Sequence, residues 1–182
     1  MKGIIFNLVE KIIVENYNED TWDDLLDSAG LDGAYTSLGS YDDSDLFKIV
    51  NAASQALGME PAAVVRMVGQ RALPMMAELY PGFFTPHANT RSFVLALNDI
   101  IHPEVRKLYP GADVPVFDFD TRRDDLLIVG YHSHRKMCAF ALGLIDGAAT
   151  HYGEVATIEE PLCMHRGDSH CEFHITFAER GD

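Results

Sequence analysis

The sequence has few basic residues and few cysteines, and each shortage excludes a class of function. Lys and Arg total 14 against 28 Asp and Glu, which leaves a formal net charge of −14 over 182 residues. A surface with this charge repels phosphate backbones and anionic lipid, so we expect neither nucleic acid nor a membrane as a partner. Three cysteines, an odd number, do not form the disulfide framework of a small secreted domain.

Long apolar runs and catalytic motifs are also missing. The first segment, 1–17, is largely apolar, but Glu10 interrupts it and no small-residue cleavage site follows. This pattern supports neither a secretion signal nor a membrane span. No kinase, cyclase or phosphate-loop motif occurs. The sequence therefore predicts a cytoplasmic protein that is not an enzyme and whose output passes to a separate protein.

The pattern of apolar residues changes along the chain from a helical period to a strand period. We expect one α+β domain over residues 1–182, with a helical N-terminal half packed on an antiparallel sheet plus a helix, because no repeat or linker divides the chain. The expected helices are 5–17, 20–30, 46–57, 61–79 with a kink or break at Pro74, 93–101 and 137–149. The expected strand pairs are 117–120 with 126–133, and 155–163 with 170–177.

His102 ends the apolar segment 93–101, and Pro103 after it disfavours helical geometry at His102. A single histidine among apolar residues is usually a hydrogen-bonded core group. A neutral imidazole leaving an apolar helix is also what a haem iron requires. Acid–base catalysis with Asp99 and Glu104 is a weaker alternative, since no nucleophile accompanies them.

Tyr131, Ser133 and Arg135 are spaced two residues apart at the end of a predicted strand. Side chains at this spacing project from one face and can converge on one anionic group. The arginine fork and the two hydroxyls suit a carboxylate, such as a haem propionate. The alternative is an exposed strand end with ordinary polar residues.

These features resemble the haem nitric oxide/oxygen binding family, which is related to the haem domain of soluble guanylate cyclase. The resemblance extends over nearly the whole chain, and Tyr131-His132-Ser133-His134-Arg135 matches the family's Tyr-x-Ser-x-Arg signature. The other residues that carry it are Met1-Lys2-Gly3-Ile4-Ile5, Ile101-His102, Lys107-Leu108-Tyr109-Pro110-Gly111 and Pro115.

The resemblance implies that haem lies between the two halves, with His102 as the proximal iron ligand. It implies that Tyr131, Ser133 and Arg135 clamp the propionates and that Pro115 presses on the porphyrin. No Cys-x-x-Cys-His motif is present for covalent attachment, so haem b is the expected cofactor.

The choice of gas depends on the distal side of the haem, where we expect Ile5, Val9, Phe140 and Leu144. Oxygen-binding members of the family place a tyrosine where this sequence has Phe140. Phenylalanine has no hydroxyl to donate to bound dioxygen, so we expect nitric oxide to bind, with carbon monoxide possible, and oxygen to be excluded. The rival hypothesis, an oxygen sensor, requires another donor, such as Tyr17 or Tyr80.

The resemblance also implies how a signal would leave the domain. Nitric oxide would weaken the bond between the iron and His102, and the helix of His102 would relax relative to Pro115. The expected partner is a separate signalling protein, a histidine kinase or a cyclic-di-GMP enzyme.

Three cysteines form a second candidate metal site. Cys163 and Cys171 lie symmetrically about Gly167, so a simple hairpin places them opposite each other, and Cys138 lies on the preceding helix. Three thiolates are three of the four ligands of a structural zinc. Related proteins with these cysteines use a histidine where this chain has Glu160, which leaves the fourth ligand open between Glu160, His134 and His165. A thiol redox module and unreactive buried thiols are the alternatives.

Overall fold

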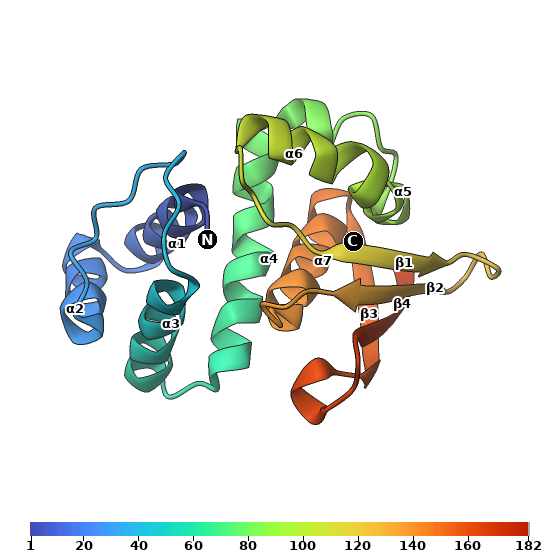
Figure 1. Cartoon of the computed structure of the whole chain (residues 1–182). Helices are drawn as coiled ribbons and strands as arrows, with labels where there is room; N and C mark the ends of the chain where they lie inside the picture. Colours follow the sequence, from blue (N-terminus) through green and yellow to red (C-terminus); the bar gives the residue numbers. More distant parts are fainter. Residues whose placement is uncertain (182) are drawn as a thin grey trace.

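The computed structural model describes residues 1–181, and only Asp182, the last residue of the predicted domain, lies outside them. It has a helical half and a half built on a four-stranded sheet, with the long helix α4 between them (Figure 1). The predicted α+β class is confirmed. The α-helices are α1 (Gly3–Asn16), α2 (Glu19–Ala29), α3 (Asp43–Leu57), α4 (Pro61–Leu79), α5 (Thr90–Leu95), α6 (His102–Leu108) and α7 (Cys138–His151). The strands are β1 (Val116–Asp120), β2 (Leu127–His132), β3 (Glu154–Leu162) and β4 (Cys171–Glu179).

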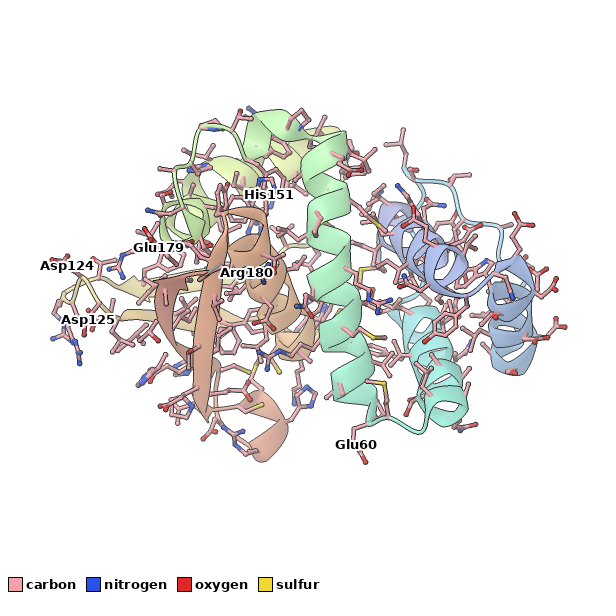
Figure 2. The ribbon with its side chains drawn as sticks, turned by 180° about the vertical axis from the view of Figure 1, so that it is seen from behind. Glu60, Asp124, Asp125, His151, Glu179 and Arg180 are labelled. Carbon is pink, nitrogen blue, oxygen red and sulfur yellow. The ribbon has the colours of Figure 1, made fainter. Side chains whose placement is uncertain are left out.

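The helical half packs α1, α2 and α3 against α4 around an apolar core that includes Phe6, Ile49 and Val68. Helix α2 begins at Glu19, one residue before the expected segment 20–30, because Asn18 is the N-cap and its side chain accepts a hydrogen bond from the backbone N–H of Thr21 at 2.8 Å. From behind, Glu60 marks the start of α4 and Asp124 the distant β1–β2 turn (Figure 2). Among residues 1–181, no helix has the length and apolar character needed to cross a membrane.

Helix α4 is one continuous helix from Pro61 to Leu79 with Pro74 inside it, so of the two predicted outcomes the break is wrong and the kink stays a prediction. Helix α7 packs directly against α4, because a Cβ atom at Gly143 would lie only 2.0 Å from the carbonyl oxygen of Arg66. This contact leaves room for no side chain at Gly143. Similar close approaches at Gly69 and Gly147 show that α4 and α7 pack together over several turns.

His102 is reached through a π-helix at Leu97–Ile101 and is the first residue of α6. Its backbone is helical, with φ −66° and ψ −37°, although Pro103 disfavours this geometry in the residue before it. Pro103 sits in the first turn of α6, where a missing N–H removes no intrahelical hydrogen bond. The π-helix, which has more residues per turn than an α-helix, connects α5 to α6.

The sheet has the order β1-β2-β4-β3 with every neighbouring pair antiparallel, which confirms both predicted hairpins. Residues on its inner face, such as Val129 and Phe173, form one core with Leu142 and Ile145 of α7. The alternate residues of β1, β2 and β4 point away from α7 toward solvent.

Candidate functional site

A cavity of about 430 Å³ lies between the two halves, within the range of small-molecule and cofactor sites. Its walls come from the first turn of α1, from α4, α6 and α7, and from β1 and β2. Most of the lining is apolar, and Lys2, Asp113 and Arg135 are the charged residues among the described ones. The sequence-predicted residues in this lining are Ile5, His102, Pro115, Tyr131, Ser133, Arg135, Phe140 and Leu144.

Val9 does not line this cavity, in contrast to the prediction from the sequence. Only the first turn of α1 reaches the cavity, and Val9 lies one turn further along, where it is 3% exposed within the helical core. Leu73 and Met76 of α4 complete the wall instead. Val9 and Tyr17 both border a separate cavity of about 70 Å³ between the helices, so Tyr17 is also excluded as a donor in the main cavity.

His102 has a strongly perturbed imidazole. Burial, together with the nearby charge of Arg106, lowers the pKa of His102 to about 4, although the backbone of Pro115 partly opposes this shift. The ring is therefore neutral at pH 7 and available as a metal ligand. Its Nδ1 atom is buried and has no well-formed hydrogen bond among residues 1–181. A neutral imidazole with an unpartnered nitrogen in an apolar cavity fits a haem iron.

Asn98, which the sequence analysis did not identify, attaches the segment of His102 to the sheet. Its Nδ2 donates to the carbonyl oxygen of Phe117 at 2.6 Å, and its Oδ1 accepts from the N–H of Phe117 at 3.1 Å. These bonds join the π-helix to the outer edge of β1. An asparagine within the apolar segment 93–101 was the signal in the sequence that a buried polar contact was needed.

Tyr131, Ser133 and Arg135 all reach the cavity from the end of β2 and the segment after it. Tyr131 is 3% exposed, and burial raises the pKa of its hydroxyl, which stays protonated as a donor. Ser133 Oγ accepts from the backbone N–H of Arg135 at 3.3 Å. The three side chains therefore present hydroxyl and guanidinium donors at one end of an apolar space.

Arg135 is held in place by acidic partners from another part of the chain. Its Nε donates to Asp43 Oδ2 at 2.6 Å, and its Nη1 donates to the carbonyl oxygen of Asp113. Burial opposes ionisation of Asp43, but hydrogen bonds from the Met1 amino group and Arg135 outweigh it and lower the pKa of Asp43. The guanidinium is thus oriented before any ligand binds, which reduces the entropy cost of binding.

Tyr80, the other candidate oxygen donor, lies in the cavity wall with its hydroxyl hydrogen-bonded to that of Tyr109. The bond connects the end of α4 to the residue that follows α6. Burial and this hydrogen bond raise the pKa of Tyr109. The hydroxyl of Tyr109 therefore remains protonated and contacts that of Tyr80.

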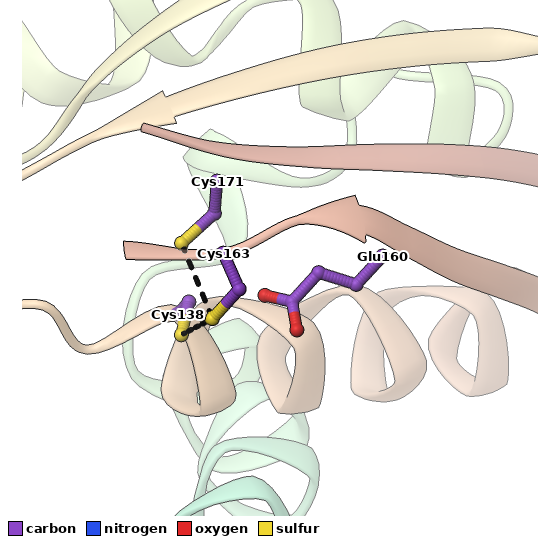
Figure 3. A group of neighbouring side chains, drawn as sticks. All are labelled: Cys138, Glu160, Cys163 and Cys171. Atoms are coloured by element: carbon purple, nitrogen blue, oxygen red, sulfur yellow. Dashed lines mark hydrogen bonds between the residues drawn. The ribbon is translucent and has the colours of Figure 1, made fainter. Parts of the chain in front are cut away.

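The three buried cysteines and the half-buried Glu160 form a cluster on the inner face of the sheet, beside the start of α7 (Figure 3). Cys163 Sγ lies 3.9 Å from both Cys138 Sγ and Cys171 Sγ, so the thiols are close but not bonded. One oxygen of Glu160 lies within 4.8 Å of all three sulfurs. Burial raises the pKa of Cys138 and of Cys171.

Glu160 is the one of the three candidate fourth ligands that joins the cysteine cluster. Its Oε1 is buried and has no hydrogen-bond partner among residues 1–181. His165 Nε2 instead contacts the carbonyl oxygen of Lys136 at 2.7 Å, and His134 Nδ1 lies 3.4 Å from Asp113 Oδ2. A buried carboxylate oxygen facing three thiols fits a divalent metal.

The fold and the site define a class of protein with an apolar, cofactor-sized cavity between a helical half and an antiparallel sheet. The Haem-NO-binding family model matches residues 2–160. An H-NOX protein from S. oneidensis in the Fe(II)NO ligation state is 34% identical, with a TM-score of 0.92 over 98% of this chain and 100% of its own. An H-NOX from Shewanella woodyi in the Fe(II)CO state is 32% identical, with a TM-score of 0.84 over 100% of this chain and 97% of its own.

A third similar structure is the unliganded Fe(II) H-NOX protein from K. algicida, with 25% identity and a TM-score of 0.88 over 98% of this chain and 97% of its own. The chain belongs to the Haem-NO-binding (H-NOX) family, which consists of haem-based gas sensors and not of enzymes.

Proposed function

We propose that residues 1–182 form one sensor domain that binds nitric oxide on haem b and excludes oxygen. The observation that carries the proposal is the neutral, unpartnered imidazole of His102 at the wall of an apolar cavity. His102 would be the axial ligand, and haem would supply the ferrous iron to which the gas binds. Tyr131, Ser133 and Arg135 would hold the propionates, and Pro115 would contact the ring.

The exclusion of oxygen rests on the polarity of the cavity wall. Ile5, Phe140 and Leu144 offer no hydrogen-bond donor, and bound dioxygen needs one whereas nitric oxide does not. The hydroxyls of Tyr80 and Tyr109 contact each other, so one of their two O–H groups is already used as a donor. An oxygen sensor is the competing hypothesis, and it requires the remaining O–H group of this pair to reach the bound gas.

Signalling would begin when nitric oxide weakens the attachment of His102. The π-helix and α6 could then move as far as Asn98 and its bonds to Phe117 allow, while Pro115 stays with the segment before β1. We propose that a separate histidine kinase or cyclic-di-GMP enzyme responds to this change.

The test is the visible spectrum of the reduced holoprotein before and after exposure to air and to nitric oxide, in the wild type and in Phe140→Tyr. We expect a nitric oxide complex in both proteins and a stable oxygen complex only in Phe140→Tyr, because the new hydroxyl supplies the missing donor. A stable oxygen complex in the wild type would support the oxygen sensor instead. His102→Gly should remove the proximal ligand, and an unchanged spectrum in that variant would refute the assignment.

We also propose that Cys138, Cys163, Cys171 and Glu160 bind one zinc ion, because the buried Oε1 of Glu160 otherwise lacks a partner. Metal analysis of the untagged protein should find one zinc per chain, and Glu160→Ala should lose it more readily during dialysis against a chelator. His165→Ala is the matched control and should retain the metal. A disulfide between two of the cysteines in freshly purified protein would favour thiol redox chemistry.

A further inference from the structure

The solvent face of the sheet carries a group of imidazoles and carboxylates that the haem site does not use. In the strand register, Gly130 of β2 lies between Asp118 of β1 and Glu172 of β4. Tyr131 pairs with Cys171, so His132 and His170 are the next facing positions. These residues alternate with buried ones, which places all four ionisable side chains on the face away from α7.

Three of these side chains, those of Asp118, His132 and His170, already contact one another, whereas Glu172 accepts a hydrogen bond from His174 Nε2 at 2.7 Å. The Nε2–H of His132 donates to Asp118 Oδ2 at 2.8 Å. The rings of His132 and His170 stack with centroids 5.0 Å apart and an interplanar angle of 14°. Ser169 Oγ contacts His170 Nδ1 at 3.0 Å, which leaves Nε2 of His170 as the free ring nitrogen.

Gly130 provides the space in which these side chains meet. A Cβ atom there would lie 3.3 Å from Cβ of Asp118, which is tighter than most real contacts, and 3.5 Å from Nε2 of His132, which is an ordinary van der Waals contact. The φ angle of Gly130 is not in the left-handed region, so no backbone demand requires glycine. The absent side chain instead allows His132 and Asp118 to lean over the strand.

We propose that this face binds a divalent transition metal of the zinc, nickel or copper class through His132, His170 and Asp118, with Glu172 completing the charge balance. Imidazole nitrogen and carboxylate oxygen are the donors that these metals accept, and the metal would replace the Nε2 proton of His132. Coordination requires the partly exposed ring of His170 to turn out of its stack with His132, so that its free nitrogen points toward His132 Nε2 and Asp118. The Ser169 contact orients that ring as an outer-shell partner does in known sites.

The sheet-face site differs in chemistry and position from the cysteine cluster. Cys171 lies between His170 and Glu172 in sequence, and its side chain is 0% exposed on the inner face. The cluster offers buried sulfur ligands, whereas the outer face offers nitrogen and oxygen ligands in contact with water. A protein with both sites would bind two metals per chain, with different preferences.

The test is a calorimetric titration of Ni²⁺ into the untagged holoprotein that has first been loaded with one equivalent of zinc. We expect one further site, with the dissociation constant raised at least about tenfold in both His132→Asn and His170→Asn, since even outer-shell changes cost 10- to 100-fold. His134→Asn is the matched control, because its side chain is 74% exposed and outside the group, and it should bind as the wild type does. Equal affinity in all four proteins would refute the site.

Nuclear magnetic resonance locates the bound metal independently of affinity. Paramagnetic Ni²⁺ should broaden the amide signals of Gly130 and Glu172 first, and Gly130→Ala should weaken this effect by filling the space over the strand. Broadening centred on Cys138 instead would assign the second metal to the cysteine cluster and overturn the proposal. An unchanged haem spectrum in each variant verifies that the domain is folded.

Discussion

The two hydrogen bonds of Asn98 should make Asn98→Ala one of the most destabilising polar substitutions near the cavity. The change removes the 2.6 Å bond to the carbonyl oxygen of Phe117 and the 3.1 Å bond from its N–H. Each neutral bond contributes about 1 kcal/mol net, and a buried group left unpaired costs about 1–3 kcal/mol. Because water can reach this partly exposed position after the change, we expect a total loss of about 2–4 kcal/mol.

The assay is urea unfolding of the haem-free protein, followed by far-ultraviolet circular dichroism. With a slope of about 2–3 kcal/mol/M for a chain of this size, the midpoint should fall by roughly 1 M. Asn51→Ala, an exposed position within α3, is the control and should leave the midpoint unchanged or raise it slightly.

The same substitution tests whether Asn98 restrains the segment of His102. In the holoprotein, Asn98→Ala should release haem faster, because the π-helix is no longer attached to β1. An unchanged midpoint together with an unchanged rate of haem release would refute the reasoning. A lower midpoint with an unchanged rate would limit the role of Asn98 to stability.

Three further predictions concern the helix contact, the proximal histidine and the tyrosine pair. Gly143→Ala should destabilise the protein by about 1–3 kcal/mol in the same unfolding assay, because its Cβ would lie 2.0 Å from an α4 carbonyl oxygen, whereas Gly82→Ala, with open space around it, should not. In the haem-free protein the pKa of His102 is lowered from 6.5 to about 4. Between these two pH values the unfolded chain therefore binds more protons at His102 than the folded protein does. Stability should therefore fall by up to about 3 kcal/mol as the pH drops from 6.5 to 4, and a flat profile in the wild type would contradict this pKa. Tyr80→Phe should cost about 1 kcal/mol and leave the gas preference in visible spectra unchanged; loss of an oxygen complex in this variant would identify Tyr80 as a distal donor.

Much of the fold and several site residues could be predicted from the sequence because they depend on local patterns. The period-two segments around 117–120 and 126–133 specified a hairpin. The two-residue spacing of Tyr131, Ser133 and Arg135 predicted that their side chains lie on one face at the end of its second strand, and all three line the cavity. The break predicted as one outcome at Pro74 is wrong, because α4 continues through that position, where it packs against Gly147 of α7. Local propensity carries no information about such a neighbour.

What the sequence alone determined was which residues are apolar, which can coordinate and which elements they occupy. Tertiary structure decided which apolar environment each residue enters: Ile5 and Val9 share one stripe of α1, but only the first turn of that helix meets the cavity. It also selected Glu160 over His165 for the cysteine cluster and brought His132 over Gly130. Spacing along a helix or strand defines a face, but the partner of that face depends on how distant segments pack.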